Sequence, residues 1–144
     1  MTVLDKLLVL ATVAQVLLTI AILVLMGRER VPRVMRGEIA VADIAVDRTA
    51  YPLKARLLSN NFDNQFQLPV LFYVAALLAL QLDLVGWLEV LLSWLFVACR
   101  YAHAAIHVTT NRVHRRFVAY AAGLAVLGLL WLWLTIRVLL APSI

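Results

Sequence analysis

Apolar side chains fill four long stretches of this chain, and polar residues gather between them. The stretches cover about residues 7–26, 66–82, 84–108 and 117–140. An α-helix needs roughly 20 residues to cross a hydrocarbon core about 30 Å thick, and the four stretches approach or exceed that length. Asp83 and Gly86 mark a tight turn between the second and the third stretch. The pattern predicts an all-α membrane protein: a four-helix transmembrane bundle, one domain over residues 1–144, with a long loop at 27–65.

The predicted first loop contains the start of a helix. Pro52 suits the first turn of a helix, where a missing N–H leaves no bond unmade. We expect the second helix to begin near Pro52 at the membrane surface and to continue into the second apolar stretch. Pro69 then lies inside this helix and should kink it.

Composition and charge agree with a membrane location and orient the chain. Hydrophobic residues make up 65% of the sequence, against about 45–50% in soluble domains. The net charge is +5, and ten basic residues lie in the first and third connections, against Lys6 and Arg137 near the termini and the second turn. Basic loops stay cytoplasmic. We therefore expect a multi-pass protein of a bacterial inner membrane, with both termini outside the cytoplasm and no nucleic-acid partner.

The third apolar stretch carries a polar stripe at helical spacing. Its members, at steps of 4, 3, 4, 3 and 4, are Glu89, Ser93, Phe96, Arg100, His103 and His107. On a helix they share an arc of about 80°, and charged groups at bilayer depth face a bundle interior or a wet cavity. Glu89 lies roughly 16 Å from Arg100 along the axis, so its partner is another group, in this chain or in another subunit, that the sequence does not name.

A second polar stripe precedes the second apolar stretch. It consists of Arg56, Asn60, Asp63, Asn64 and Gln67. Two polar faces at the same depth predict a shared, hydrated pocket, in which Asp63 is the expected counter-charge of Arg100 because a carboxylate matches the guanidinium fork. The alternative is that both faces only hold helices together through hydrogen bonds and ion pairs.

Three further groups near the stripes could take part in the chemistry of the pocket: Cys99, Tyr120 and the pair His103 and His107. The single Cys99 excludes an internal disulfide and, about 100° from Arg100 on a helix, is expected to be a packing residue. Tyr120 could reach the pocket from the fourth helix. His103 and His107 could bind a metal or a haem, but the neighbouring Arg100 would repel a cation, and we expect no metal.

Two segments resemble the MAPEG family, the membrane-associated proteins in eicosanoid and glutathione metabolism that include microsomal glutathione transferases. The segment RLLSNNFDN, which starts at Arg56, resembles the family's R-x3-N-x2-E stretch at the start of the second helix. Arg100-x2-His103-x3-His107 resembles its third-helix R-x2-[HY]-x3-Y. Arg116 lies at the spacing where several members carry an arginine that activates a thiol.

The resemblance implies a homotrimer with glutathione bound between neighbouring subunits at the cytoplasmic side. The residues that it assigns to glutathione are Arg56, Asn60, Asp63, Arg100, His103 and His107. Arg116 is assigned to the thiolate, with Arg112 and Arg115 as possible replacements, because a nearby arginine lowers a thiol pKa from its usual value of about 8.5. The expected function is a glutathione-dependent transferase or peroxidase that acts on lipophilic electrophiles from the bilayer.

Two positions depart from the family pattern. Asp63 stands where the family has Glu, and His107 stands where many members have Tyr. Both changes bear on thiol identity and on turnover, and they leave the predicted fold unchanged. The alternative function is therefore a non-catalytic MAPEG-like membrane subunit, or a small transporter, that uses the polar faces for helix or partner contacts.

Overall fold

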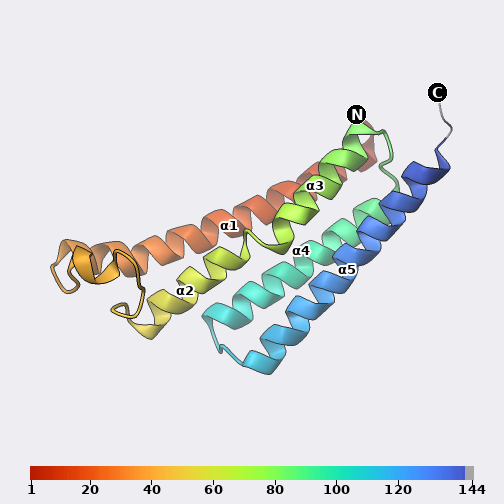
Figure 1. Ribbon diagram of the computed structural model, residues 1–144. Helices are drawn as coiled ribbons and strands as arrows, with labels where there is room; N and C mark the ends of the chain where they lie inside the picture. Colours follow the sequence, from red (N-terminus) through yellow and green to blue (C-terminus); the bar gives the residue numbers. More distant parts are fainter. Residues whose placement is uncertain (142–144) are drawn as a thin grey trace.

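The computed structural model describes residues 1–141, and these contain five α-helices and no β-strand. The elements are α1 (Val3–Met35), the short 3₁₀ helix η1 (Val41–Ile44), α2 (Leu53–Asn64), α3 (Leu68–Gln81), α4 (Trp87–Val108) and α5 (Val113–Leu140). Figure 1 shows α2 and α3 following one another end to end, between α1 and the pair α4 and α5 in this view. If α2 and α3 are taken as one interrupted helix, the fold is the predicted four-helix bundle.

The chain is an integral membrane protein. Three helices, α1, α4 and α5, are long and apolar enough to cross a bilayer. With 14 residues, α3 alone is shorter than the roughly 20 that a full crossing needs. Large apolar side chains cover the outside of the bundle, as at Leu17, Leu77 and Leu132. Such a surface matches lipid tails, and in water it would be an aggregation hazard.

The helices extend further than the apolar stretches do. The predicted loop at 27–65 is too long, because α1 continues to Met35 and α2 occupies residues 53–64. Between these two helices, residues 36–52 are irregular apart from η1. Hydropathy marks the membrane crossing, whereas the helix itself can continue into polar sequence. At the end of α1 it does so with support from the ion pair between Glu29 and Arg33, four residues apart on one helical face (3.5 Å).

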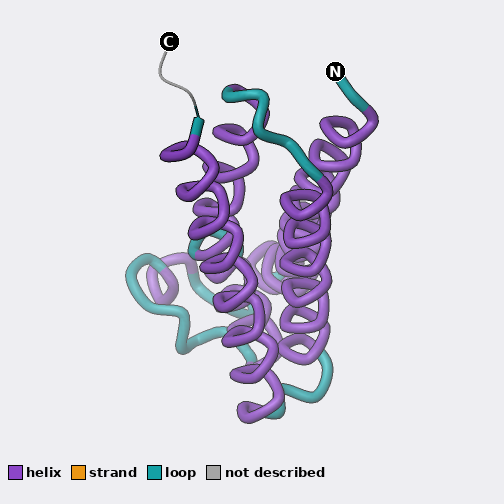
Figure 2. The backbone as a smooth tube through the Cα atoms, turned by 90° about the vertical axis from the view of Figure 1, so that its right-hand side faces the viewer, coloured by secondary structure: helices purple, strands orange, loops and turns teal. Residues whose placement is uncertain are grey.

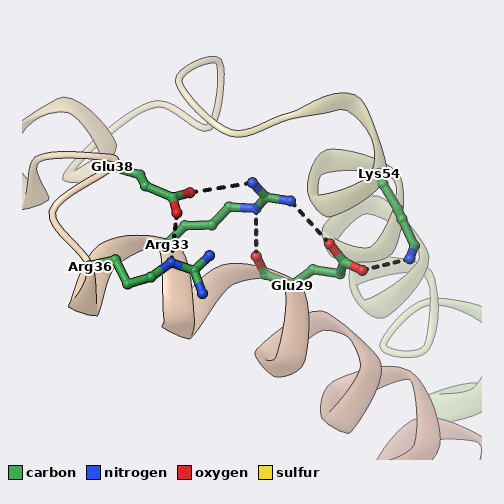
Figure 3. A network of polar contacts seen from close by, with 5 residues as sticks. All are labelled: Glu29, Arg33, Arg36, Glu38 and Lys54. Atoms are coloured by element: carbon green, nitrogen blue, oxygen red, sulfur yellow. Dashed lines mark hydrogen bonds and ion pairs between the residues drawn. The ribbon is translucent and has the colours of Figure 1, made fainter.

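An ionic network joins this extension of α1 to α2 (Figure 3). Lys54 of α2 lies 2.6 Å from Glu29, which also binds Arg33. Glu38, just beyond α1, binds both Arg33 and Arg36. All five side chains lie at the molecular surface or close to it, so each pair contributes only about 0–1 kcal/mol.

The second membrane passage is interrupted, where a kink at Pro69 was expected. α2 ends at Asn64 and α3 begins at Leu68, which places Pro69 in the first turn of a new helix. Proline fits there without losing a backbone hydrogen bond. Pro52 precedes α2 directly, in agreement with the predicted start of the second helix.

Both described chain ends lie at the same end of the bundle (Figures 1 and 2). We call this the terminal end; it also holds the connection between α3 and α4, where Asp83 adopts a positive φ of 53°. The opposite end, called the loop end, holds residues 36–52 and the α4–α5 connection. Between the two ends, Phe72 of α3 packs against Phe96 of α4 (ring centroids 4.9 Å apart) in an apolar core.

Candidate functional site

The predicted stripe of α4 faces the interior of the bundle. Its six members are all buried: Glu89, Ser93, Phe96, Arg100, His103 and His107. Five of them carry polar atoms, so the stripe needs partners along its whole length. Those partners differ between the terminal end and the loop end.

A cavity of about 480 Å³ opens at the loop end, between the two predicted polar stripes. It is lined by Asn60, Asp63 and Asn64 of α2, Gln67 of the break, His103 and His107 of α4, and Val113, Arg116, Phe117 and Tyr120 of α5. Its size falls in the range of about 300–1,000 Å³ that is typical of small-molecule sites. The two stripes therefore share one pocket, and Tyr120 reaches it.

The two histidines of the cavity have unused hydrogen-bonding groups. His103 donates from Nδ1 to the backbone carbonyl of Arg116 (3.1 Å), because a carbonyl can only accept. Its Nε2 atom is buried and has no partner among residues 1–141, and the same holds for both ring nitrogens of His107. The rings of His103 and His107 meet edge to face at 5.7 Å, and His103 lies at the same centroid distance from Tyr120.

Arg116 brings a guanidinium to the cavity from the first turns of α5. Its Nη1 atom donates to the Asn111 side chain (2.8 Å), and Asn111 adopts a positive φ of 46° that asparagine tolerates. The neighbouring Arg112 and Arg115 are exposed and do not line the cavity. Of the three arginines considered for the thiolate, Arg116 is the one that the fold brings to the pocket.

The predicted ion pair between Asp63 and Arg100 is wrong. Asp63 is exposed and binds Arg48 of the irregular segment, with Nη1–Oδ2 and Nη2–Oδ1 distances of 2.6 and 3.4 Å. This hydrogen-bonded pair raises the pKa of Arg48 above its ordinary value. Helical spacing could not reveal the partner, because Arg48 lies in a segment without periodicity.

Two residues assigned to glutathione from the sequence lie outside the cavity lining. Arg100 is only 1% exposed and donates from Nη2 to the backbone carbonyl of Asn64 (2.9 Å), while its Nε and Nη1 atoms have no partner in the described part of the chain. Arg56 is half-buried, and its Nε atom is also unpaired there. Five of the predicted site residues thus line the cavity: Asn60, Asp63, His103, His107 and Arg116. Arg56 and Arg100 do not line it.

Apart from Tyr120, four lining residues were not among the predicted site residues. Asn64 and Gln67 belong to the polar stripe of the second helix, so their spacing already indicated them. Val113 and Phe117 were not singled out, because exposed apolar residues at the start of a membrane helix carry no distinctive signal. They add an apolar border to an otherwise polar cavity.

At the terminal end, the same stripe is fully paired. Glu89 accepts hydrogen bonds from the Gly86 backbone N–H (3.0 Å), Trp133 Nε1 (3.0 Å) and Arg137 Nη1 (2.8 Å). Its partner is therefore Arg137 of α5 in the same chain, and no second subunit is needed. A Cβ at Gly86 would lie 2.9 Å from Glu89 Oε2 and 3.2 Å from Arg137 Nη1, so a side chain there would make these two groups shift.

Cys99 packs against α5, where its Cβ lies 3.5 Å from the position a Cβ would take at Gly123. Residues 1–141 contain no group of three or more His, Cys, Asp or Glu side chains placed to hold a metal ion. Neither observation adds a second chemical centre to the cavity.

The fold and the cavity define a class: a helical integral membrane protein with a polar ligand pocket at one end of its bundle. A family model described as MAPEG family matches residues 8–136, nearly the whole chain, and the protein belongs to this family. Membership associates it with the membrane proteins of eicosanoid and glutathione metabolism. No curated protein and no solved structure matches the chain.

Proposed function

We propose that the protein is a glutathione-dependent transferase or peroxidase that acts on lipophilic electrophiles. One observation carries this proposal: His103, His107 and Arg116 line one cavity of about 480 Å³, and the two histidines carry three buried ring nitrogens that have no partner in residues 1–141. Buried polar groups are normally hydrogen-bonded. A site of this kind suits a small, highly polar ligand, and glutathione offers two carboxylates, an amine, two peptide groups and a thiol.

The lining residues suggest a division of roles. Asn60 matches the peptide groups of the ligand, and Asp63 matches its amine once the amine displaces Arg48. His103 and His107 provide the remaining polar contacts, while Arg116 stabilises the thiolate. In a transfer step, the thiolate sulfur forms a bond to an electrophilic carbon, and the leaving group departs with the bonding electrons. In a peroxidase step, two glutathione molecules give a disulfide, and the hydroperoxide is reduced to an alcohol and water.

The border of the cavity supports a lipophilic second substrate. Val113 and Phe117 are each 65% exposed and line the cavity at the start of α5. An apolar molecule that diffuses in the bilayer can reach the thiolate past these two side chains without crossing the polar wall of α2.

The assembly and the orientation are part of the same proposal. We propose a homotrimer, by the family resemblance, in a bacterial inner membrane. The loop end faces the cytoplasm because ten of the thirteen Lys and Arg residues lie in the connections at that end or in the helix segments next to them. Both termini then lie outside the cytoplasm, and soluble glutathione reaches the cavity from the cytoplasmic side.

A non-catalytic subunit or a small transporter is the second candidate. The ion pair between Asp63 and Arg48 favours it, since the only carboxylate in the described lining is already engaged. This candidate predicts no thiol affinity, and it predicts stoichiometric co-purification with another chain.

Thiolate absorbance separates the two candidates. We expect purified protein with bound glutathione to show the ultraviolet band of a thiolate at neutral pH, and Arg116→Ala to abolish it. Arg115→Ala is the matched control, because Arg115 is exposed and lies outside the cavity lining. Wild-type protein that binds glutathione without a thiolate band, or equal loss in both variants, would contradict the assigned role of Arg116.

A further inference from the structure

The interruption between α2 and α3 frees backbone carbonyls that a continuous helix would have paired. The last four of α2 nevertheless all have donors. Gln65 N donates to Phe62 O (2.9 Å), and Phe66 N donates to Asp63 O (3.1 Å). Side chains supply the other two bonds: Gln65 Nε2 binds Asn61 O (3.2 Å) and Arg100 Nη2 binds Asn64 O (2.9 Å). An unpaired backbone group away from water costs several kcal/mol, so these side chains make the break tolerable.

The same side chains fasten the break to two other helices. Gln15 of α1 donates from Nε2 to Gln65 Oε1 (3.1 Å), and Asn61 Nδ2 donates to the carbonyl of Ala104 in α4 (3.3 Å). Gln65 also donates to Asn61 Oδ1 (3.1 Å). Gln15, Asn61, Gln65 and Arg100 are all at most 1% exposed. We call these four residues the brace.

The brace lies directly behind the α2 wall of the cavity. Asn60, Asp63 and Asn64 lie at the end of α2 next to the brace residues Asn61 and Gln65, and Gln67 lies within the break. No brace residue lines the cavity itself. A change in the angle or register of the break would therefore move the polar wall as a unit and weaken its contacts with a bound ligand.

We propose that Arg100 and Gln65 are positioning residues: they pin the break between α2 and α3 to α4 and α1, and so hold the polar α2 wall in place for the ligand. The part of this proposal that concerns glutathione rests on the proposed function; the part that concerns the break does not. A cation at the C-terminal end of α2 also faces the negative pole of that helix. The competing role for Arg100 is direct contact with a ligand carboxylate.

Hydrogen exchange without any thiol tests the conformational part. In detergent-purified protein, we expect Arg100→Met to speed amide exchange at Gln65 and Phe66 about tenfold, because losing one hydrogen bond to a charged donor shifts a local opening equilibrium by about that factor. Arg28→Met is the matched control. Arg28 is exposed and has no hydrogen bond or ion pair to another side chain in residues 1–141. Equal rates of amide exchange at Gln65 and Phe66 in the wild type, Arg100→Met and Arg28→Met would overturn the proposal.

Gln65→Met supplies a second variant that keeps every cavity-lining side chain. We expect it to speed exchange at the break as well, and to raise the KM for glutathione about fivefold with kcat within about twofold of wild type, since the loss of uniform binding changes KM alone. Arg100→Lys, which keeps a cationic donor, should restore part of the affinity lost in Arg100→Met. If Arg100→Met weakens glutathione binding while Gln65→Met leaves both binding and exchange unchanged, Arg100 is a direct ligand residue and the positioning role is wrong.

The exchange measurement tests the brace, and the binding measurement tests the proposed function, so either proposal can be contradicted without the other. Protein with fast exchange at the break in both variants, but with no glutathione affinity even in the wild type, supports the brace and contradicts the proposed function. Protein that binds glutathione with wild-type affinity in both brace variants contradicts the coupling between the break and the cavity wall.

Discussion

The polar face of α4 ends in two buried clusters that differ in how completely their hydrogen bonds are made. At the terminal end, the carboxylate of Glu89 receives three donors, from Gly86, Trp133 and Arg137. At the loop end, neither ring nitrogen of His107 makes a hydrogen bond in the described structure, and the guanidinium of Arg100 uses one of its donor atoms. Both ends belong to the same helix and the same stripe, so sequence spacing alone does not separate them.

This difference separates a structural cluster from a candidate site. The Glu89 cluster is closed, because its acceptor and donors satisfy one another, and a Cβ at Gly86 would crowd both Glu89 and Arg137. The loop-end cluster borders a cavity and keeps buried polar groups unused. Unsatisfied polar groups are retained where function compensates for their cost to stability. We infer that the terminal end holds the bundle together and that the loop end binds a ligand.

The largest expected effect is on stability at the terminal end. Arg137→Met leaves the carboxylate of Glu89, which is 1% exposed, without its counter-charge. Breaking a buried ion pair from one side costs about 3 kcal/mol or more. We expect the free energy of unfolding, measured by denaturant titration in mixed micelles, to fall by about that amount. Glutathione affinity should stay unchanged, because the ion pair lies at the opposite end of α4 from the cavity.

Lys6→Met is the control for that measurement. It removes another basic residue at the terminal end, but an exposed one that forms no ion pair in residues 1–141. A similar loss of stability in both variants, or a loss of glutathione affinity in Arg137→Met, would contradict the separation of the two ends.

At the loop end, stability and binding should change in opposite directions. His107→Phe removes two buried, unpaired nitrogens and keeps a ring of similar shape. We expect the free energy of unfolding to rise by up to about 1 kcal/mol, because the cost of an unsatisfied polar group disappears. The Kd for glutathione should increase about tenfold through the loss of one hydrogen bond to a charged ligand.

The exposed His114→Phe is the matched control and should change neither quantity. If instead His107→Phe destabilises the bundle, His107 holds helices together, and the loop end is a structural cluster like the terminal end.

The smallest expected effect concerns Arg48, which competes with the amine of glutathione for the carboxylate of Asp63. The Arg48 and Asp63 side chains are 44% and 49% exposed, so Arg48→Ala should change the free energy of unfolding by less than about 1 kcal/mol. It frees Asp63, and we expect the Kd for glutathione to fall about twofold, in the range of a weak surface ion pair. Arg36→Ala breaks a comparable exposed pair with Glu38, away from the cavity, and should leave the Kd unchanged. A weaker affinity in Arg48→Ala would mean that Arg48 itself contacts the ligand.

Local periodicity made the main features predictable from the sequence. The buried face of α4 and the polar face of α2 follow from steps of three and four residues, and both occur in the structure. The partner of Glu89 could also have been predicted from the order of the helices. α4 and α5 are joined by a short connection and run antiparallel, so Glu89 and Arg137 lie at the same end of the bundle.

The contacts that periodicity could not predict involve irregular backbone. Arg48 reaches Asp63 from a segment without repeating spacing, and the orientation of Arg100 depends on a helix that ends at Asn64. The break itself had a signal beyond Pro69. Five Asn and Gln residues lie between positions 60 and 67, and such side chains bind nearby backbone groups and compete with helical hydrogen bonds. The prediction of a kink at Pro69 did not take this cluster into account.

Equilibrium titration of glutathione into the detergent-purified wild-type protein tests the central claim most directly. If the loop end is a ligand site, binding should saturate with a Kd of about 1 mM or lower, equivalent to roughly 4 kcal/mol, and His107→Phe should weaken it while Arg137→Met should not. In a calorimetric titration, heat that grows linearly with added glutathione, without saturation, and that is the same for the wild type, His107→Phe and Arg137→Met would contradict the claim.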